Sequence, residues 1–166
     1  MSPAKTLYLL RHAKSSWDDA RLADHDRPLA PRGVRNTAAL AVHLRAARIS
    51  PALILCSSAQ RARETLAGVV PALDDETVIL IEDRLYGAGA GKLIERLREV
   101  GESIASVMVI GHNPGLEDLA AGLDPRASAA PLPTAALATF ELGGSWADLA
   151  SGAASLVDRY TPRGPA

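Results

Sequence analysis

Four short runs of apolar residues are spread through the first two thirds of the chain. They cover residues 6–10, 53–56, 78–81 and 107–110. Runs of this length are typical of strands buried in a sheet. The segments between them carry apolar residues at helical spacing, which predicts helices at about 31–48, 58–70 and 93–100, and Pro114 can open another. The alternation predicts an α/β fold of three α/β/α layers around a mainly parallel sheet.

Some element boundaries follow from single residues. Pro31 suits the first position of a helix, although Ala30 before it is a poor capping residue. Ser58 is a good N-cap for the next helix. After a loop rich in proline and alanine at about 124–133, the segments 135–142 and 154–160 are expected to be edge strands.

Composition narrows the class of protein. The 166 residues are 48% apolar and 22% charged, which predicts a single globular domain over 1–166. A formal net charge of −1 and few aromatic side chains argue against a nucleic-acid or membrane partner. Cys56 is the one cysteine, and the short polar N-terminus does not resemble a signal peptide, so we expect a cytoplasmic protein.

Polar residues follow each of the four apolar runs. Arg11 and His12 come after the first, Arg61 one turn into the helix after the second, Asp83 after the third and His112 after the fourth. Because ligands of parallel sheets bind at the carboxyl ends of the strands, we expect these side chains to converge.

The chemistry of this set favours an anion. Arginine forks match phosphate oxygens two at a time, and Arg61 lies where free backbone N–H groups and the helix dipole also attract negative charge. Nearby positive charge disfavours the imidazolium form, so His12 is expected to be neutral and nucleophilic. The arginines would repel a metal ion, and no carboxylate cluster accompanies the histidines.

Three motifs carry a resemblance to a known family. The segment 10–17, Leu-Arg-His-Ala-Lys-Ser-Ser-Trp, resembles the Arg-His-Gly motif of the histidine phosphatase (phosphoglycerate mutase-like) superfamily. The serine pair followed by Arg-Ala-x-x-Thr at 57–65 and the apolar strand ending in Gly-His at 109–113 resemble its other two motifs. Order and spacing agree over roughly 6–120. The form of the first motif and the loop at 26–29 look most like the small bacterial phosphohistidine phosphatases.

The resemblance implies roles for the converging residues. His12 would attack phosphorus and carry the phosphoryl group, while Arg11, Arg61 and His112 would hold the oxygens. Water would then hydrolyse the phosphohistidine, with no metal or organic cofactor. Ser15 is expected to line the pocket, although a solvated loop position is the alternative.

The sequence does not decide which residue, if any, is the acid that protonates the leaving group. Family members that cleave esters often place a Glu four residues before a Gly, and Asp83 stands four residues before Gly87. Glu82 is the alternative, and so is the absence of any acid. Asp18 stands where mutase-type members carry an Asn that touches phosphate, and its charge would repel phosphate, so we do not assign it to the pocket.

The sequence therefore predicts a metal-independent phosphatase acting on protein phosphohistidine. The alternatives are a phosphomonoesterase for a small metabolite or nucleotide, and a non-catalytic phosphate-binding regulatory module. A mutase is disfavoured because the chain lacks the sequence for a large lid over the site. The expected partner is a phosphorylated protein or a small phosphorylated metabolite.

Overall fold

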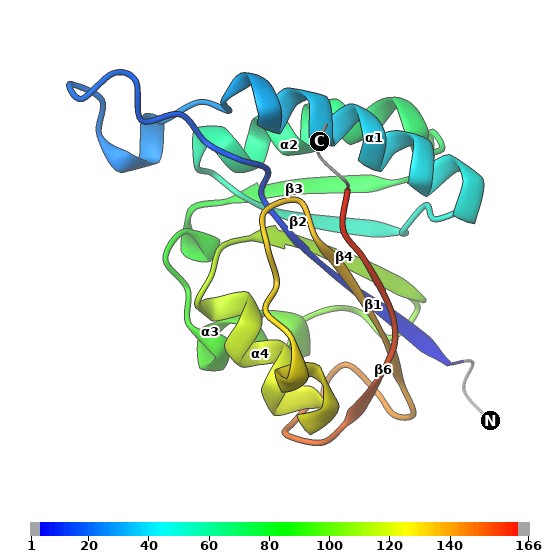
Figure 1. The fold of residues 1–166 in the computed structure, drawn as a ribbon. Coiled ribbons are helices and arrows are strands. Elements are labelled where there is room, and N and C mark those ends of the chain that lie inside the picture. Colours follow the sequence, from blue (N-terminus) through cyan, green and yellow to red (C-terminus); the bar gives the residue numbers. More distant parts are fainter. Residues whose placement is uncertain (1–3, 163–166) are drawn as a thin grey trace.

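A six-stranded sheet runs through the centre of the computed structural model, which describes residues 4–162 (Figure 1). The strand order is β3-β2-β4-β1-β5-β6. The first four strands are parallel, and β5 and β6 add antiparallel pairs at one side, so the predicted α/β fold is confirmed with a mixed, mainly parallel sheet. The strands are β1 (Lys5–Arg11), β2 (Leu53–Ser57), β3 (Val78–Glu82), β4 (Ser106–Gly111), β5 (Leu137–Leu142) and β6 (Ala154–Tyr160).

Helices cover both faces of this sheet, which gives the three expected layers. On one face lie α1 (Pro31–Ala47) and α2 (Gln60–Val69), and on the other α3 (Ala90–Arg98) and α4 (Gly115–Leu123) (Figure 1). Short 3₁₀ turns join them: η1 (Asp24–Asp26), η2 (Val70–Ala72), η3 (Asp83–Leu85) and η4 (Pro125–Ala129). None of the helices in residues 4–162 has the length and apolar character needed to cross a membrane.

The core lies in two parts because successive strand residues point to opposite faces of the sheet. Leu10, Ile54 and Ile110 pack with Leu40 and Leu44 of α1 on one face. The neighbouring residues of the same strands pack against α3 and α4 on the other. These two cores fix the strand ends, where His12 and His112 follow β1 and β4.

Two predictions need correction: the N-cap of α2 and the place of β5 in the sheet. Ser58 is not an N-cap: α2 begins at Gln60, the cap position is Ala59, and no side chain caps it. The hydroxyl of Ser57 accepts from the Ala59 N–H instead, at 3.2 Å. β5 is not an edge strand, because it pairs with β1 on one side and β6 on the other. By contrast α1 begins at Pro31, as predicted.

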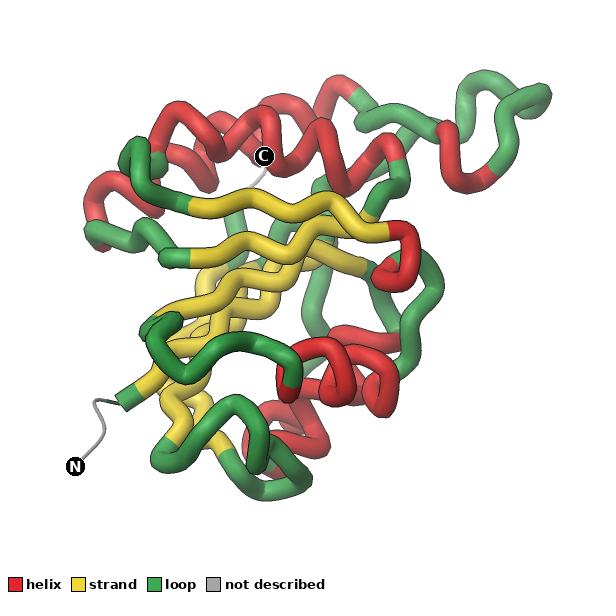
Figure 2. The backbone as a smooth tube through the Cα atoms, turned by 180° about the vertical axis from the view of Figure 1, so that it is seen from behind, coloured by secondary structure: helices red, strands yellow, loops and turns green. Residues whose placement is uncertain are grey.

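The apolar run 78–81 forms the strand that it predicts, but at the edge of the sheet. β3 pairs with β2 alone among the described strands, and it is the uppermost strand in Figure 2. Val78, Ile79, Leu80 and Ile81 are all exposed, by 37% to 51%. A short apolar run alone cannot distinguish a central strand from an edge strand, because both need a β-forming sequence.

Candidate active site

His12 follows β1 and is nearly buried, with 7% of its surface exposed. Its backbone N–H donates to the Gly111 carbonyl at 3.0 Å, which ties it to the end of β4. Its Nδ1 lies 2.8 Å from the Ala13 carbonyl oxygen. A carbonyl oxygen can only accept, so Nδ1 carries the proton in this contact. In the neutral ring Nε2 then keeps its lone pair and is available as a nucleophile.

His112 faces His12 across the site. Their ring centroids are 5.1 Å apart, with the planes tilted by 51°. Burial lowers the pKa of His12 to about 3, with the hydrogen bond to the Ala13 carbonyl opposing the shift and the nearby His112, Arg61 and Arg11 adding to it. Burial and then Arg61 lower the pKa of His112 to about 4. Both rings are therefore neutral at pH 7.

The loop after His12 is held against α2. The Ala13 N–H donates to Thr65 Oγ1 at 2.9 Å, and this hydroxyl donates to the Arg61 carbonyl at 2.7 Å. The first turn of α1 also lies close, since a Cβ at Gly33 would stand 2.2 Å from the Lys14 carbonyl oxygen. Thr65 thus couples the position of the nucleophile to that of the Arg61 backbone.

Arg11 and Arg61 bring guanidinium groups beside His12. Arg11 donates from an Nη to the Leu132 carbonyl at 3.2 Å, and the Arg61 side chain is buried. Within residues 4–162, Arg11 Nε, Arg61 Nε and His112 Nδ1 are buried and have no hydrogen-bond partner. Buried polar groups are nearly always paired, so three such nitrogens around one nucleophile indicate a site that receives acceptor atoms. Phosphate oxygens fit both arginines.

Asp24 supplies a carboxylate that the sequence did not indicate. It lies in η1, and its Oδ2 accepts from Arg61 at 3.0 Å and from the Tyr86 hydroxyl at 2.5 Å. Its Oδ1 accepts from Arg27 Nε at 3.1 Å, and its backbone carbonyl accepts from Arg61 at 2.7 Å. The hydrogen bond from Tyr86 and the contacts with both arginines hold the pKa of Asp24 well below its usual range. Asp24 is therefore ionised and acts as an acceptor.

Two serines support the histidines of the site. Ser57 Oγ lies 2.8 Å from His112 Nε2 at the end of β2. Ser58 Oγ lies 2.9 Å from Nε2 of His25, a ring that also packs edge-on against Tyr86 with centroids 4.8 Å apart. His25 and Tyr86 thus form a wall beside His112, whose own ring centroid is 5.6 Å from that of Tyr86.

Comparisons with known proteins agree with this geometry. Residues 7–113 match the model of the histidine phosphatase superfamily (branch 1), which is well over half of the chain. The chain belongs to the histidine phosphatase superfamily. An uncharacterized protein of Mycobacterium tuberculosis is 38% identical over 165 residues, covering 93% of this chain and all of that protein.

Solved structures extend the comparison to the whole fold. The SixA protein of Agrobacterium tumefaciens is 28% identical with a TM-score of 0.83, over 95% of this chain and 98% of that one. The protein histidine phosphatase SixA complexed with tungstate is 25% identical with a TM-score of 0.80, over 95% and 97% of the two chains. The predicted family and its likeness to bacterial phosphohistidine phosphatases are confirmed. Family membership supports a phosphatase enzyme.

Four of the residues expected of a histidine phosphatase come together as predicted in one cluster, which we call the pocket: Arg11, His12, Arg61 and His112. Ser15 is buried, but its contact is with Arg27, which donates to its hydroxyl at 2.7 Å. Asp18 is exposed, in keeping with its exclusion from the pocket. The roles of all these residues in turnover stay predictions.

The predicted acids lie outside this cluster. Asp83 is exposed in η3, and no hydrogen bond or ion pair links its side chain to another described residue. Glu82 accepts two hydrogen bonds from Arg96, at 2.7 and 2.9 Å, and a third from Arg84. Asp83 thus stays a prediction without a supporting contact, while Asp24 is the carboxylate that touches a pocket arginine.

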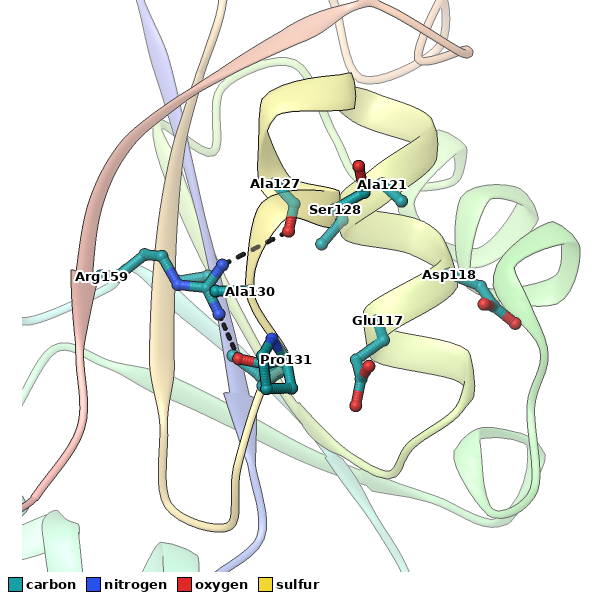
Figure 3. A pocket seen from close by; sticks show the side chains of 11 residues that line it. Glu117, Asp118, Ala121, Ala127, Ser128, Ala130, Pro131 and Arg159 are labelled. Carbon is teal, nitrogen blue, oxygen red and sulfur yellow. Dashed lines mark hydrogen bonds between the residues drawn. The ribbon is translucent and has the colours of Figure 1, made fainter.

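A separate cavity of about 290 Å³ lies between α4, η4 and the last two strands (Figure 3). Glu117, Asp118 and Arg159 line it among small apolar side chains. The Arg159 guanidinium donates from Nη1 to the Ala127 carbonyl and from Nη2 to the Pro131 carbonyl. None of the four pocket residues lines this cavity. Within the part of the chain that the structure describes, no three His, Cys, Asp or Glu side chains gather as metal ligands.

Proposed function

We propose that the protein removes the phosphoryl group from phosphohistidine on another protein, through a phosphoryl intermediate on His12 Nε2. The observation that carries the proposal is the state of His12. Its Nδ1–H is fixed on the Ala13 carbonyl, and the ring is kept neutral, so Nε2 presents a lone pair. A residue that only binds phosphate would not need a neutral imidazole, since a cationic one would attract the anion more strongly.

The reaction takes two displacements at phosphorus. His12 Nε2 forms a bond to phosphorus as the P–N bond of the substrate breaks, and the leaving imidazole nitrogen keeps the electron pair of that bond. Water then attacks the phosphoryl group on His12: a P–O bond forms as the P–Nε2 bond breaks, Nε2 recovers its lone pair, and a water proton passes to a phosphate oxygen, so inorganic phosphate is released. Arg11, Arg61 and His112 would donate to the phosphoryl oxygens in both transition states, using the nitrogens that have no partner in the described residues.

The proposed substrate class follows from whether the leaving group needs a proton from the protein. An alkyl ester leaves as a poor alkoxide and needs a placed acid, whereas phosphohistidine protonated on its far nitrogen leaves as neutral imidazole. The carboxylate at the pocket, Asp24, is held ionised by Tyr86, Arg61 and Arg27, so it is in the wrong state to donate. This environment favours a phosphoramidate over an alkyl ester. SixA, a protein histidine phosphatase by name, is one of the structural relatives.

The test compares two substrates on the purified protein in the presence of a metal chelator. One is a protein phosphorylated on histidine, and the other is an aryl phosphate, each with the wild type and with His12→Ala. We expect faster wild-type turnover of phosphohistidine, unaffected by the chelator and lost in the variant. A brief reaction with labelled substrate, quenched in alkali, should also trap labelled wild-type protein.

Each other result points to a named alternative. Turnover of the aryl ester alone would keep the His12 mechanism and make the protein a phosphomonoesterase for a small metabolite or nucleotide. Phosphate binding without turnover or trapped label would indicate a regulatory module. Loss of activity on chelation, restored by a metal ion, would overturn the metal-independent mechanism. We place the proposed activity in the cytoplasm, where the single buried thiol of Cys56 stays reduced.

A further inference from the structure

Trp17 has the largest exposed fraction of the large apolar side chains in residues 4–162, with 70% of its surface open to solvent. It lies on the segment 13–30, which projects from the carboxyl end of β1 in Figure 1. Single apolar side chains are common on protein surfaces, so exposure alone does not indicate a site. Trp17 is distinguished by the support beneath its ring and by its place beside the pocket.

The Arg27 guanidinium supports one face of the Trp17 ring. Its Cζ lies 3.5 Å from the ring centroid, which is within the range of a cation–π interaction. Arg27 is itself buried, and it donates to the Ser15 hydroxyl at 2.7 Å and to the Ser16 carbonyl at 3.1 Å. Its Nε also donates to Asp24 at 3.1 Å. Because the ring is already held in place, it loses little conformational freedom when a partner covers its other face.

Backbone hydrogen bonds close the base of the segment 13–30. The Ser16 N–H donates to the Pro28 carbonyl at 2.8 Å, and the Ala30 N–H donates to the Lys14 carbonyl at 2.8 Å. The segment therefore leaves the sheet as a closed loop whose two ends are tied together. The tryptophan comes directly after this tied base, so its position is fixed relative to the end of β1.

Two side chains stand between Trp17 and the pocket. Arg27, beneath the ring, forms an ion pair with Asp24 at 3.1 Å, and Asp24 forms another with Arg61 at 3.0 Å. A phosphoryl group held by Arg61 is therefore separated from the ring by both of them, and a small phosphorylated metabolite in the pocket does not extend to Trp17. A phosphohistidine on a protein surface brings its neighbouring residues with it, and these residues can reach the ring.

We propose that the exposed face of Trp17 is a docking contact for the protein that carries the phosphohistidine, an inference that rests on the proposed function. An apolar side chain of the partner, close to its phosphohistidine, packs on the free face of the indole ring. The indole Nε1–H adds one hydrogen-bond donor at the rim of this contact. Tryptophan is enriched among the residues that dominate protein interfaces, because it buries a large apolar area and carries one polar group.

The charges next to Trp17 restrict the chemistry of the partner further. The Asp19 carboxylate is paired with Arg21 at 3.0 Å. Asp18 is exposed, and its carboxylate forms no ion pair within the part of the chain that the structure describes. A negative charge therefore remains beside the ring. Because like charges that face each other oppose binding, the partner surface carries a Lys or Arg beside its apolar side chain.

Kinetics on two substrates that share the same P–N bond test the proposal. One is a protein phosphorylated on a surface histidine with phosphoramidate, and the other is free phosphohistidine. For Trp17→Ala we expect KM on the phosphoprotein to rise at least about tenfold with little change in kcat, because docking binds ground state and transition state equally. On free phosphohistidine the variant should match the wild type within about twofold, which also shows that it folds. Val42→Ala, at a residue of α1 that is 64% exposed, is the matched control and should leave both substrates unaffected.

The possible failures give different results. Equal changes on both substrates, or no change on either, would overturn the docking role of Trp17 while the phosphatase function stands. A wild type that cleaves neither substrate would overturn the proposed function, and the docking role with it. Asp18→Lys tests the charge of the partner: KM on the phosphoprotein should rise by about threefold at low ionic strength, and salt should remove the effect. A fall in KM would overturn the basic partner surface.

Fluorescence reports the contact directly. His12→Ala cannot form the phosphoryl intermediate, so it should bind a phosphoprotein that lacks tryptophan without consuming it. The emission of Trp17 should then shift to shorter wavelengths, because the partner removes its ring from water. Trp146 is already fully buried and should not contribute to the shift. An unchanged spectrum at saturating phosphoprotein would contradict the contact.

Discussion

The pocket has two halves that are built differently. One half stands at the ends of buried strands: Arg11 and His12 after β1, Ser57 on β2 and His112 after β4. The other half comes from loops: Asp24 lies on the segment 13–30, which projects from the sheet in Figure 1, and Tyr86 follows the turn η3. Arg61 on α2 connects the two halves, since it lies beside His12 and bonds Asp24.

The difference separates two tasks. Strand ends held by two hydrophobic cores can fix a nucleophile and its oxygen-binding groups to within a fraction of an ångström, as in-line transfer requires. Asp24 is about half exposed and touches the pocket through Arg61, so it acts on the orientation of that guanidinium. We therefore expect changes in the strand-end half to abolish turnover and changes in the loop half to reduce it.

The largest effect should come from His12→Ala. Without Nε2 no phosphoryl intermediate can form, so we expect a fall in kcat of at least about a thousandfold on every substrate. Stopped assays with labelled substrate measure both turnover and trapped label, and circular dichroism checks the fold. A variant that keeps wild-type turnover would remove His12 from the mechanism, whatever happens in the loop half.

Arg61→Ala should have the next largest effect, because it affects both halves. It removes an oxygen-binding group from the pocket and one of the two ion pairs of Asp24, leaving the pair with Arg27. Loss of one such group typically costs about 100- to 1,000-fold in kcat. Arg63→Ala is the matched control: Arg63 is exposed on the same helix, and we expect it to retain nearly full activity. Equal losses in the two variants would indicate damage to α2 in place of a role for Arg61.

Asp24→Asn should have a smaller effect, confined to the loop half. The amide keeps the size of the side chain but loses the charge that orients Arg61, so we expect about a tenfold loss of kcat/KM on phosphohistidine. Asp26→Asn is its control, since Asp26 lies in the same turn and its carboxylate contacts His25 alone among the described side chains. A loss seen with an alkyl ester but absent with phosphohistidine would instead make Asp24 a leaving-group acid.

The strand-end half could be predicted from the sequence because each of its residues directly follows, or lies one turn after, a recognisable strand. A short apolar run predicts a strand, a parallel sheet brings strand ends to one edge, and the residue after each run is then a site candidate. His12 and His112 follow from this reasoning. Thr65 belongs to the quoted motif, and the structure gives its physical reason: it joins the Ala13 N–H to the Arg61 carbonyl.

The loop half could not be predicted in the same way. Asp24 reaches Arg61 and Tyr86 across 37 and 62 residues of sequence, and no periodic pattern encodes such contacts. The position of the turn after β3 could not be predicted for a related reason. Parallel strands do bring their ends to one edge, but β3 is the outermost strand, so a residue after it can face solvent. Asp83 does so, and Tyr86 is the residue of that segment that reaches Asp24.

Asp83→Asn should have the smallest effect, and it decides which half supplies the acidic group. Its side chain is exposed and touches none of the pocket residues, so we expect a change of less than about twofold in kcat/KM on both phosphohistidine and an alkyl phosphate. Asp24→Asn, measured beside it, provides the comparison. If Asp83→Asn lowers ester cleavage strongly and phosphohistidine cleavage little, η3 must move towards the pocket when substrate binds. The acid would then come from the turn after β3, as the spacing to Gly87 predicts.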